Sequence, residues 1–173
     1  MKKILSCILI AMMCVSLFSC TENPDVSSGK SNETENVGNT TAEKFVFELN
    51  GVSFSPNDNT ADFISKLGEP ASYFESESCA FQGLDKVYTY SGIVIRTYPK
   101  DNADYVLNIE LKDDSVSTPE GAFIGDSVDT VKQIYGTPDD ETSTALIYKK
   151  DATLLYFTFA DDTVTAITYT TNP

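Results

Sequence analysis

Hydrophobic and polar positions divide the chain into three stretches. Residues 4–17 form an apolar run of 14 residues behind a basic start, and Ser19 and Cys20 follow it closely. A basic start, a short apolar run and a small residue before a cleavage site are typical of a signal peptide. The run is shorter than the roughly 20 apolar residues that a transmembrane helix needs. We therefore predict a signal peptide over residues 1–19, with a short membrane anchor or a buried helix as the alternative.

The second stretch is polar. Between residues 21 and 44, Ser, Thr, Asn, Glu and Gly dominate, and large apolar side chains are almost absent. Such a segment cannot bury enough surface to offset the entropy that is lost when it orders. We predict that residues 20–44 form a disordered tether that begins with Cys20. Residues 45–171 are then long enough to form one domain with a core.

Strand-like alternation fills the third stretch. Residues 45–49 and 52–54 flank Asn50-Gly51, the sequence of a two-residue hairpin turn. Further segments rich in β-branched and aromatic residues, the composition of strands, follow in two series. They are residues 87–90, 93–98 and 106–111, and then residues 145–148, 154–159 and 164–169.

A repeated pattern precedes each series of strands. Residues 58–70 match residues 126–138 at a constant offset, with Asp at the start of each segment and Gly-x-Pro at its end. An Asp can cap a helix N-terminus, and apolar residues three and four apart give a helix one buried face. Gly ends a helix, and Pro two positions later prevents its continuation. The repeat predicts one short capped helix in each segment.

Together these elements predict an α+β fold. Each half of the domain, about 45–115 and 116–171, would hold one helix and three strands, and the first half carries an insertion at 75–86. Two such tandem helix-plus-three-strand repeats would form one curved antiparallel sheet with the helices on one face.

The middle strand of the first half predicts which face of the sheet stays open. Arg96 shares a face with Val94 and Tyr98, and a charged side chain without a partner is rarely buried beneath helices. The match between the halves then places Phe157 and Phe159 on the same face. Exposed Tyr, Phe and Arg are typical of a protein-binding surface. The candidate partner-binding residues are Tyr88, Tyr90, Arg96, Tyr98, Tyr148, Phe157 and Phe159. The inverted arrangement, with these aromatic residues in the core beneath the helices, remains an open alternative.

The end of the apolar run resembles a lipobox, the cleavage motif of bacterial lipoproteins. Leu17 and Ser19 fit that pattern before Cys20, whereas Phe18 stands where a smaller residue is usual. The resemblance implies a diacylglyceryl group on Cys20, which would anchor the chain to the cell membrane or outer membrane on its extracytoplasmic side. Ordinary secretory cleavage, which releases a soluble protein, is the alternative.

A short helix ending in Gly-x-Pro before a three-stranded meander, repeated in tandem, resembles the β-lactamase-inhibitor-protein-like fold. It is also similar to the outer-membrane lipoprotein modules of the BamE (SmpA/OmlA) type, most closely over residues 121–131 and 135–138. Members of these families with a known role mostly bind other proteins. The resemblance therefore implies a protein-binding or envelope-assembly module whose partner is an unidentified envelope or extracellular protein.

Composition argues against several other functions. The chain has a formal net charge of −14, which disfavours nucleic acid, because binding there depends on Lys and Arg that neutralise phosphates. It contains no His, so the usual Ser-His-Asp and Cys-His systems are excluded. We expect no enzymatic activity and no cofactor. Cys79, the one Cys beyond Cys20, is expected to be buried and inert, because Ala80 and Phe81 follow it.

The acidic pairs Asp113-Asp114, Asp139-Asp140 and Asp161-Asp162 stand at predicted strand or helix ends. None has the spacing of a Ca²⁺-binding loop, so we interpret them as solvated turn residues and predict no metal site. The alternative function is a small-ligand or metal-ion receptor that uses these turns and the insertion around Cys79.

Overall fold

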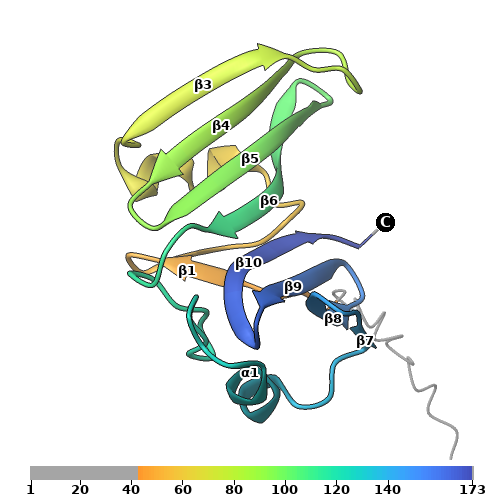
Figure 1. The fold of residues 1–173 in the computed structure, drawn as a ribbon. Helices are drawn as coiled ribbons and strands as arrows, with labels where there is room; N and C mark the ends of the chain where they lie inside the picture. The colour runs from red at the N-terminus through yellow and green to blue at the C-terminus, as the bar shows by residue number, and fades with distance from the viewer. Residues whose placement is uncertain (1–42, 173) are drawn as a thin grey trace, which may run out of the picture. The chain divides into compact units, whose positions relative to one another are not determined.

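The structure, a computed structural model, describes residues 43–172. The predicted signal peptide, Cys20 and nearly all of the predicted tether lie outside the described residues. The described part is mainly β (Figure 1). Its strands are β1 Phe47–Leu49, β2 Val52–Phe54, β3 Ser72–Glu77, β4 Leu84–Tyr90, β5 Ile93–Lys100, β6 Ala103–Leu111, β7 Asp140–Glu141, β8 Ala145–Lys150, β9 Thr153–Ala160 and β10 Thr163–Thr171. Its helical segments are the 3₁₀ turns η1 Thr60–Asp62 and η2 Ile64–Leu67 and the α-helix α1 Val128–Tyr135.

The predicted fold class is wrong. Among the described residues there is one eight-stranded antiparallel sheet, a small two-stranded sheet and one short α-helix, rather than two helix-plus-three-strand repeats. Each strand predicted in the two series lies within an observed strand, from β4 to β6 and from β8 to β10. The sequence patterns did not predict β3 and β7, which make each half a set of four strands.

The first predicted helix does not form as an α-helix. Residues 60–67 make two 3₁₀ turns that meet at Phe63, whose φ of −138° is not helical. The Phe63 ring stacks on Phe54 with centroids 4.5 Å apart, and the Thr60 hydroxyl donates to the backbone carbonyl of Asp104. These contacts to the β1–β2 hairpin and to β6 hold the segment in a shape that an uninterrupted helix would not match.

The second predicted helix is confirmed as α1. Its cap is Ser127, whose hydroxyl accepts from the backbone N–H of Thr130; the neighbouring Asp126 instead accepts from the backbone N–H of Phe123. Gly136 ends the helix at a positive φ of 80°, and its N–H donates to the carbonyl of Lys132. The apolar face of α1 buries Val128 and Val131.

The large sheet has the strand order β3-β4-β5-β6-β10-β9-β8-β7 (Figure 1). The last strand of each half, β6 and β10, pair along the middle of the sheet, where Ile109 lies opposite Tyr169. The predicted hairpin at Asn50-Gly51 is also confirmed, since Leu49 pairs with Val52 and both turn residues have positive φ.

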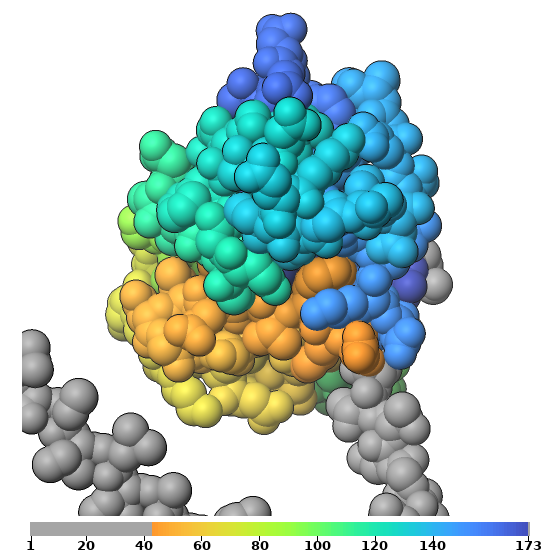
Figure 2. Space-filling model, turned by 90° about the horizontal axis from the view of Figure 1, so that it is seen from below, coloured from red at the N-terminus to blue at the C-terminus, as the bar shows by residue number. Residues whose placement is uncertain are grey.

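The core lies on one face of this sheet. Side chains of β4 to β6 and of β8 to β10 that share this face pack against the β1–β2 hairpin, the 3₁₀ turns and α1. Figure 2 shows the orange hairpin region beside the teal segment that includes α1. The fully buried members include Phe47, Phe54, Ile93, Ile95, Ile109, Leu111, Leu155, Phe157, Ile167 and Tyr169. Aromatic rings join the layers, because Phe47 makes edge contacts with both Phe54 and Tyr169.

Candidate functional site: the open face of the sheet

The register fixes which side chains share the face opposite the core, because successive residues of a strand point to opposite faces. One row of paired residues runs through Phe74, Val87, Arg96, Asn108, Thr170, Leu154 and Lys149. A second row runs through Ser72, Thr89, Val94, Glu110, Thr168, Tyr156, Ile147 and Asp140. We call these two rows the open face.

The open face carries apolar side chains on both sides of its centre. Phe74 is 62 % exposed, whereas Val94 and Leu154 are only 7 % exposed although neither belongs to the core cluster. Neighbouring side chains on the same face must therefore shield them. In Figure 1 this face of β3, β4 and β5 is turned toward the viewer, and the 3₁₀ turns lie behind the strands.

The centre of the open face is polar. Glu110 contacts two cations, at 3.6 Å from Arg96 and at 3.1 Å from Lys112. The side-chain oxygen of Asn108, which is paired with Arg96 in the register, is buried and has no hydrogen-bond partner among the described residues. A buried polar atom without a partner costs roughly 1–3 kcal/mol. The centre of the face thus contains one exposed guanidinium and one unsatisfied acceptor.

Aromatic residues continue the open face beyond Arg96. Tyr98 follows it two positions later on β5, and its ring lies 5.2 Å from Phe81 and 5.9 Å from Tyr105. The Tyr98 hydroxyl donates to the side-chain oxygen of Asn57. A groove of about 340 Å³ opens here, lined by Asn57, Phe81, Tyr98, Lys100, Leu107 and Thr171. We call it the aromatic groove.

The structure separates the residues that were predicted to form one exposed patch. Arg96 is exposed on the open face and Tyr98 is half-buried there. Tyr90, Tyr148 and Phe157 are buried in the core, with exposed fractions of 8 %, 4 % and 0 %. Tyr88 and Phe159 are partly buried and pack against the core. The predicted contiguous patch is therefore wrong, and the inverted arrangement holds for these five aromatic residues.

A slip of one residue between the two halves caused the error. The sequence comparison matched Ile93 with Leu154, but the register pairs Ile93 with Tyr90 and Leu155 with Tyr148. The β8–β9 hairpin continues past Tyr148 for two further residue pairs before it turns. Because side chains alternate along a strand, a slip of one residue moves every side chain to the opposite face.

Burial affects the acidity of the tyrosine hydroxyl groups on the core side of the sheet. Desolvation is the first cause that raises the pKa of Tyr88, Tyr90 and Tyr148. Tyr148 donates to the backbone carbonyl of Gly136 at the end of α1. Their rings therefore lie on the core side of the sheet and not on the open face.

Several residues of the open face escaped the sequence analysis. Phe74 lies on β3, a strand that was not predicted. The sequence of β3, Ser-Tyr-Phe-Glu-Ser-Glu, is rich in polar residues, and the structure shows that all six residues are exposed. Tyr156 precedes Phe157 directly, so placing Phe157 on the open face implied that Tyr156 faced the core. The signal that could have found Tyr156 is Thr158, the polar residue that shares its face in the way that Arg96 shares the face of Val94.

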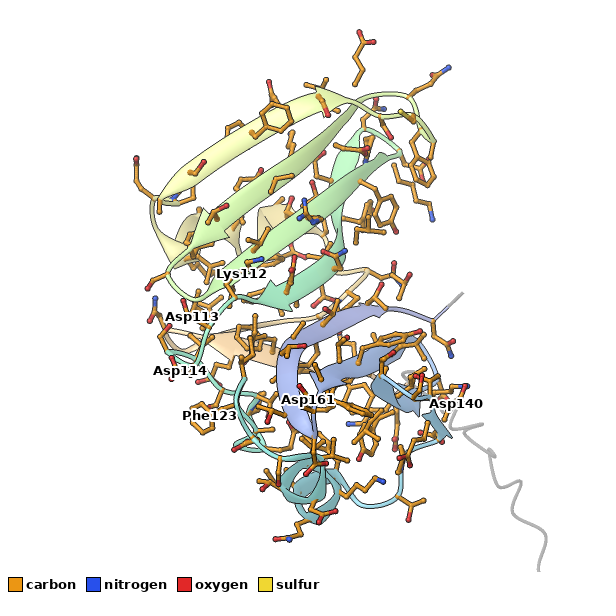
Figure 3. The ribbon with its side chains drawn as sticks, viewed as in Figure 1. Lys112, Asp113, Asp114, Phe123, Asp140 and Asp161 are labelled. Atoms are coloured by element: carbon orange, nitrogen blue, oxygen red, sulfur yellow. The ribbon has the colours of Figure 1, made fainter. Side chains whose placement is uncertain are left out.

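Asp113-Asp114 and Asp161-Asp162 lie at turns, as predicted, whereas Asp140 belongs to β7 and Asp139 precedes that strand. Figure 3 shows Asp113 and Asp114 together at the end of β6, with Asp140 and Asp161 apart from them. Asp113 accepts from the backbone N–H and the hydroxyl of Ser115, and these bonds lower the pKa of its exposed carboxyl. Within residues 43–172 no three His, Cys, Asp or Glu side chains converge as metal ligands.

Cys79 is exposed, so its predicted burial is wrong. It stands in the turn that joins β3 to β4, where the Ser78 hydroxyl accepts from the backbone N–H groups of Ala80 and Phe81. The turn projects Phe81 onto Tyr98 rather than burying the Cys that precedes it.

In comparisons with other proteins, no protein-family model, curated protein or solved structure matches the chain. The resemblance to β-lactamase-inhibitor-protein-like and BamE-type domains therefore remains a prediction. Over the part of the chain that the structure describes, no helix is long and apolar enough to cross a membrane.

Proposed function

We propose that this domain is a protein-binding module that engages its partner through the open face. The observation that carries the proposal is the exposed Arg96 at the centre of a sheet face whose apolar side chains include the exposed Phe74. A partner that brings a carboxylate to Arg96 would form a charge-assisted hydrogen bond with its guanidinium.

The chemistry of the face supports this function. Binding hot spots are enriched in Tyr and Arg and are surrounded by contacts that exclude water. Arg96 lies on the same face as Tyr156, Phe74 and the nearly buried Val94. Arg is also suited to bidentate contact with a partner carboxylate.

We further propose that the module is held at the extracytoplasmic side of a membrane by lipid on Cys20. The lipobox-like residues that end at Cys20 support this proposal. Buried acyl chains contribute about 0.8 kcal/mol for each CH₂ group, so two or more long chains give stable attachment. Substitution Cys20→Ser should release the protein from the membrane fraction. Retention of the variant there, with no lipid found on the wild-type residue by mass spectrometry, would contradict the anchor.

The binding function is tested by site-specific photocrosslinking in the native membrane. A photoreactive amino acid is placed at Val87 or Ile147, both on the open face, and at Gln133, which is exposed on α1. We expect the two open-face positions to give the same adduct and Gln133 to give none. Arg96→Glu should reduce the yield of that adduct at least fivefold.

The matched control is Lys66→Glu, which makes the same change of charge on η2, on the side of the sheet away from the open face. It should leave the adduct unchanged, and circular dichroism should show that both variants fold. Adducts from Gln133 alone, or equal yields for wild type and Arg96→Glu, would exclude the open face as the binding site.

The aromatic groove favours a second candidate function, the binding of a small anionic aromatic ligand. Phe81 and Tyr98 provide the apolar wall, and Lys100, which makes no ion pair among the described residues, provides the charge. Anilinonaphthalene sulfonate is a suitable probe. Its fluorescence should rise on binding to the wild type, and Phe81→Ala and Lys100→Glu should each abolish most of that rise.

A further inference from the structure

The outer edge of β3 is free over its whole length. All six residues of β3 are exposed, and its ladder to β4 occupies only one of its two edges. No other backbone hydrogen bond in the described part of the chain reaches residues 72–77. Alternate residues of such a strand therefore direct their N–H and C=O groups outward to solvent.

The opposite edge of the same sheet is protected against pairing with a further strand. The terminal strand there, β7, has two residues, Asp140 and Glu141. Pro138 precedes it, and Lys132 of α1 forms an ion pair with Glu141 at 2.9 Å. Short charged strands are a usual protection against pairing with another chain, so β3 is the edge that can accept a further strand.

A groove lies beside β3 on the helix side of the sheet. It has a volume of about 570 Å³, and its lining includes Ile64, Glu69, Pro70, Tyr73, Tyr88 and Tyr90. Tyr73 is 47 % exposed, and its ring lies 5.0 Å from Tyr88. A strand added to β3 would alternate its side chains between this groove and the open face next to Phe74.

The charge along the edge selects the chemistry of that added strand. Glu75 and Glu77 share the helix-side face with Tyr73, and Glu69 lines the groove. The nearest cation, Lys86, lies opposite Glu75 but is held by Asp104 at 2.6 Å. Opposite charges on neighbouring strands attract and like charges repel. A second copy of this acidic chain is therefore a poorer occupant than a basic segment.

We propose that β3 accepts an extended basic segment of a partner protein by strand addition, as a ninth strand of the sheet. Lys or Arg side chains of that segment face Glu75 and Glu77, and the alternate apolar side chains lie beside Phe74. Main-chain hydrogen bonds supply affinity in this mode of recognition, and the alternate side chains supply specificity. The site goes beyond the open-face proposal, because it needs neither Arg96 nor Asn108.

The test uses the full-length protein and a fluorescent, end-blocked octapeptide of alternating Lys and Val. Fluorescence anisotropy should show saturable binding. Methylation of four consecutive backbone nitrogens keeps the side chains and the charge but removes the donors, so it should weaken binding at least tenfold. The double variant Glu75→Lys/Glu77→Lys should weaken binding of the unmodified peptide at least fivefold.

Two control variants separate this site from general electrostatics and from the open face. Glu48→Lys/Asp114→Lys makes the same change of charge at exposed positions away from β3, and it should bind within twofold of the wild type. Arg96→Glu should also bind as the wild type does, so the edge and the open face can fail independently. Equal binding of the methylated peptide would overturn strand addition. A concentration-dependent dimer that blocks the peptide would assign the edge to a second copy instead.

Discussion

Two neighbouring aromatic residues of β9 lie on opposite faces of the sheet. Phe157 is fully buried, and its ring lies 5.1 Å from Tyr135 of α1 and 5.9 Å from Tyr148. Tyr156 is half-buried on the open face, opposite Thr168 and Ile147. Removing either ring changes the same strand, but only one removal leaves a cavity in the core.

We predict that Phe157→Ala lowers the free energy of unfolding by about 3–5 kcal/mol, the usual cost of deleting a buried aromatic ring. Tyr156→Ala should cost about 1 kcal/mol or less, because its surroundings can relax into solvent. Urea denaturation followed by circular dichroism measures both. If Phe157→Ala does not fold, Phe157→Leu provides the comparison. Equal losses for the two positions would contradict the register of β9.

At the scale of elements, two hairpins each have a turn glycine with the same backbone conformation, but the surroundings of the two glycines differ. Gly51 joins β1 to β2 with a φ of 77°, and Gly92 joins β4 to β5 with a φ of 78°. A Cβ atom on Gly51 would meet nothing within 4 Å, whereas one on Gly92 would lie 2.7 Å from the Ser115 hydroxyl oxygen and 2.8 Å from Val116. The turn at Gly92 is thus packed against the chain that leaves β6.

We predict that Gly51→Ala costs about 1–2 kcal/mol, the penalty for a side chain in the left-handed region. Gly92→Ala should cost about 1–3 kcal/mol more, because it adds an overpacked contact to the same backbone penalty. The difference between their free energies of unfolding isolates the contact. A difference near zero would show that the segment at Ser115 and Val116 yields freely.

The elements that the sequence predicted correctly are recognisable from their own residues, without their neighbours in the fold. β5 and β9 are rich in β-branched and aromatic residues, and α1 has its own cap and its own terminating Gly136. The elements that it missed depend on their neighbours. β3 is wholly exposed, with its ladder to β4 on one edge, and Phe63 breaks a helical pattern in order to stack on Phe54. The intrinsic helix and strand propensities of residues do not include such tertiary contacts, so they cannot predict these elements.

Of the candidate site, the sequence predicted the face that carries Arg96 but not the side chains that β9 adds to that face. Arg96 marks the open face because a guanidinium is costly to bury, and the structure places it there. Carrying that assignment to β9 needed the exact length of the β8–β9 hairpin, which differs from that of β4–β5. An error of one residue in length inverts a whole strand, whereas it would leave the existence of the strand unchanged.

At the scale of the whole molecule, charge is the dominant feature. The chain has 26 acidic and 12 basic residues. The five ion pairs of the described part engage Lys44, Lys86, Arg96, Lys112 and Lys132, and most of these side chains are partly exposed. Exposed pairs contribute roughly 0–1 kcal/mol each, so repulsion among the excess carboxylates should outweigh them.

We predict that added salt stabilises the domain, because screening weakens this repulsion over the Debye length of about 10 Å at 0.1 M. The melting temperature should rise by a few degrees between about 20 and 200 mM NaCl. An uncharged osmolyte at the same osmolality is the control. The same salt should weaken binding of the basic peptide at β3. A melting temperature that falls with salt would show that the ion pairs dominate.

The pairing of β6 with β10 along the middle of the sheet has a consequence for biosynthesis. β10, Thr163–Thr171, follows β6 by more than 50 residues in the chain, so the strand that joins the two halves is made well after the strand it pairs with. Until it emerges, β6 lacks its neighbour and Ile109 and Leu111 lack the side chains of Tyr169 and Ile167. The domain therefore cannot complete its core before β10 has been made. Deletion of the nine residues of β10 would remove the link between the two halves of the sheet.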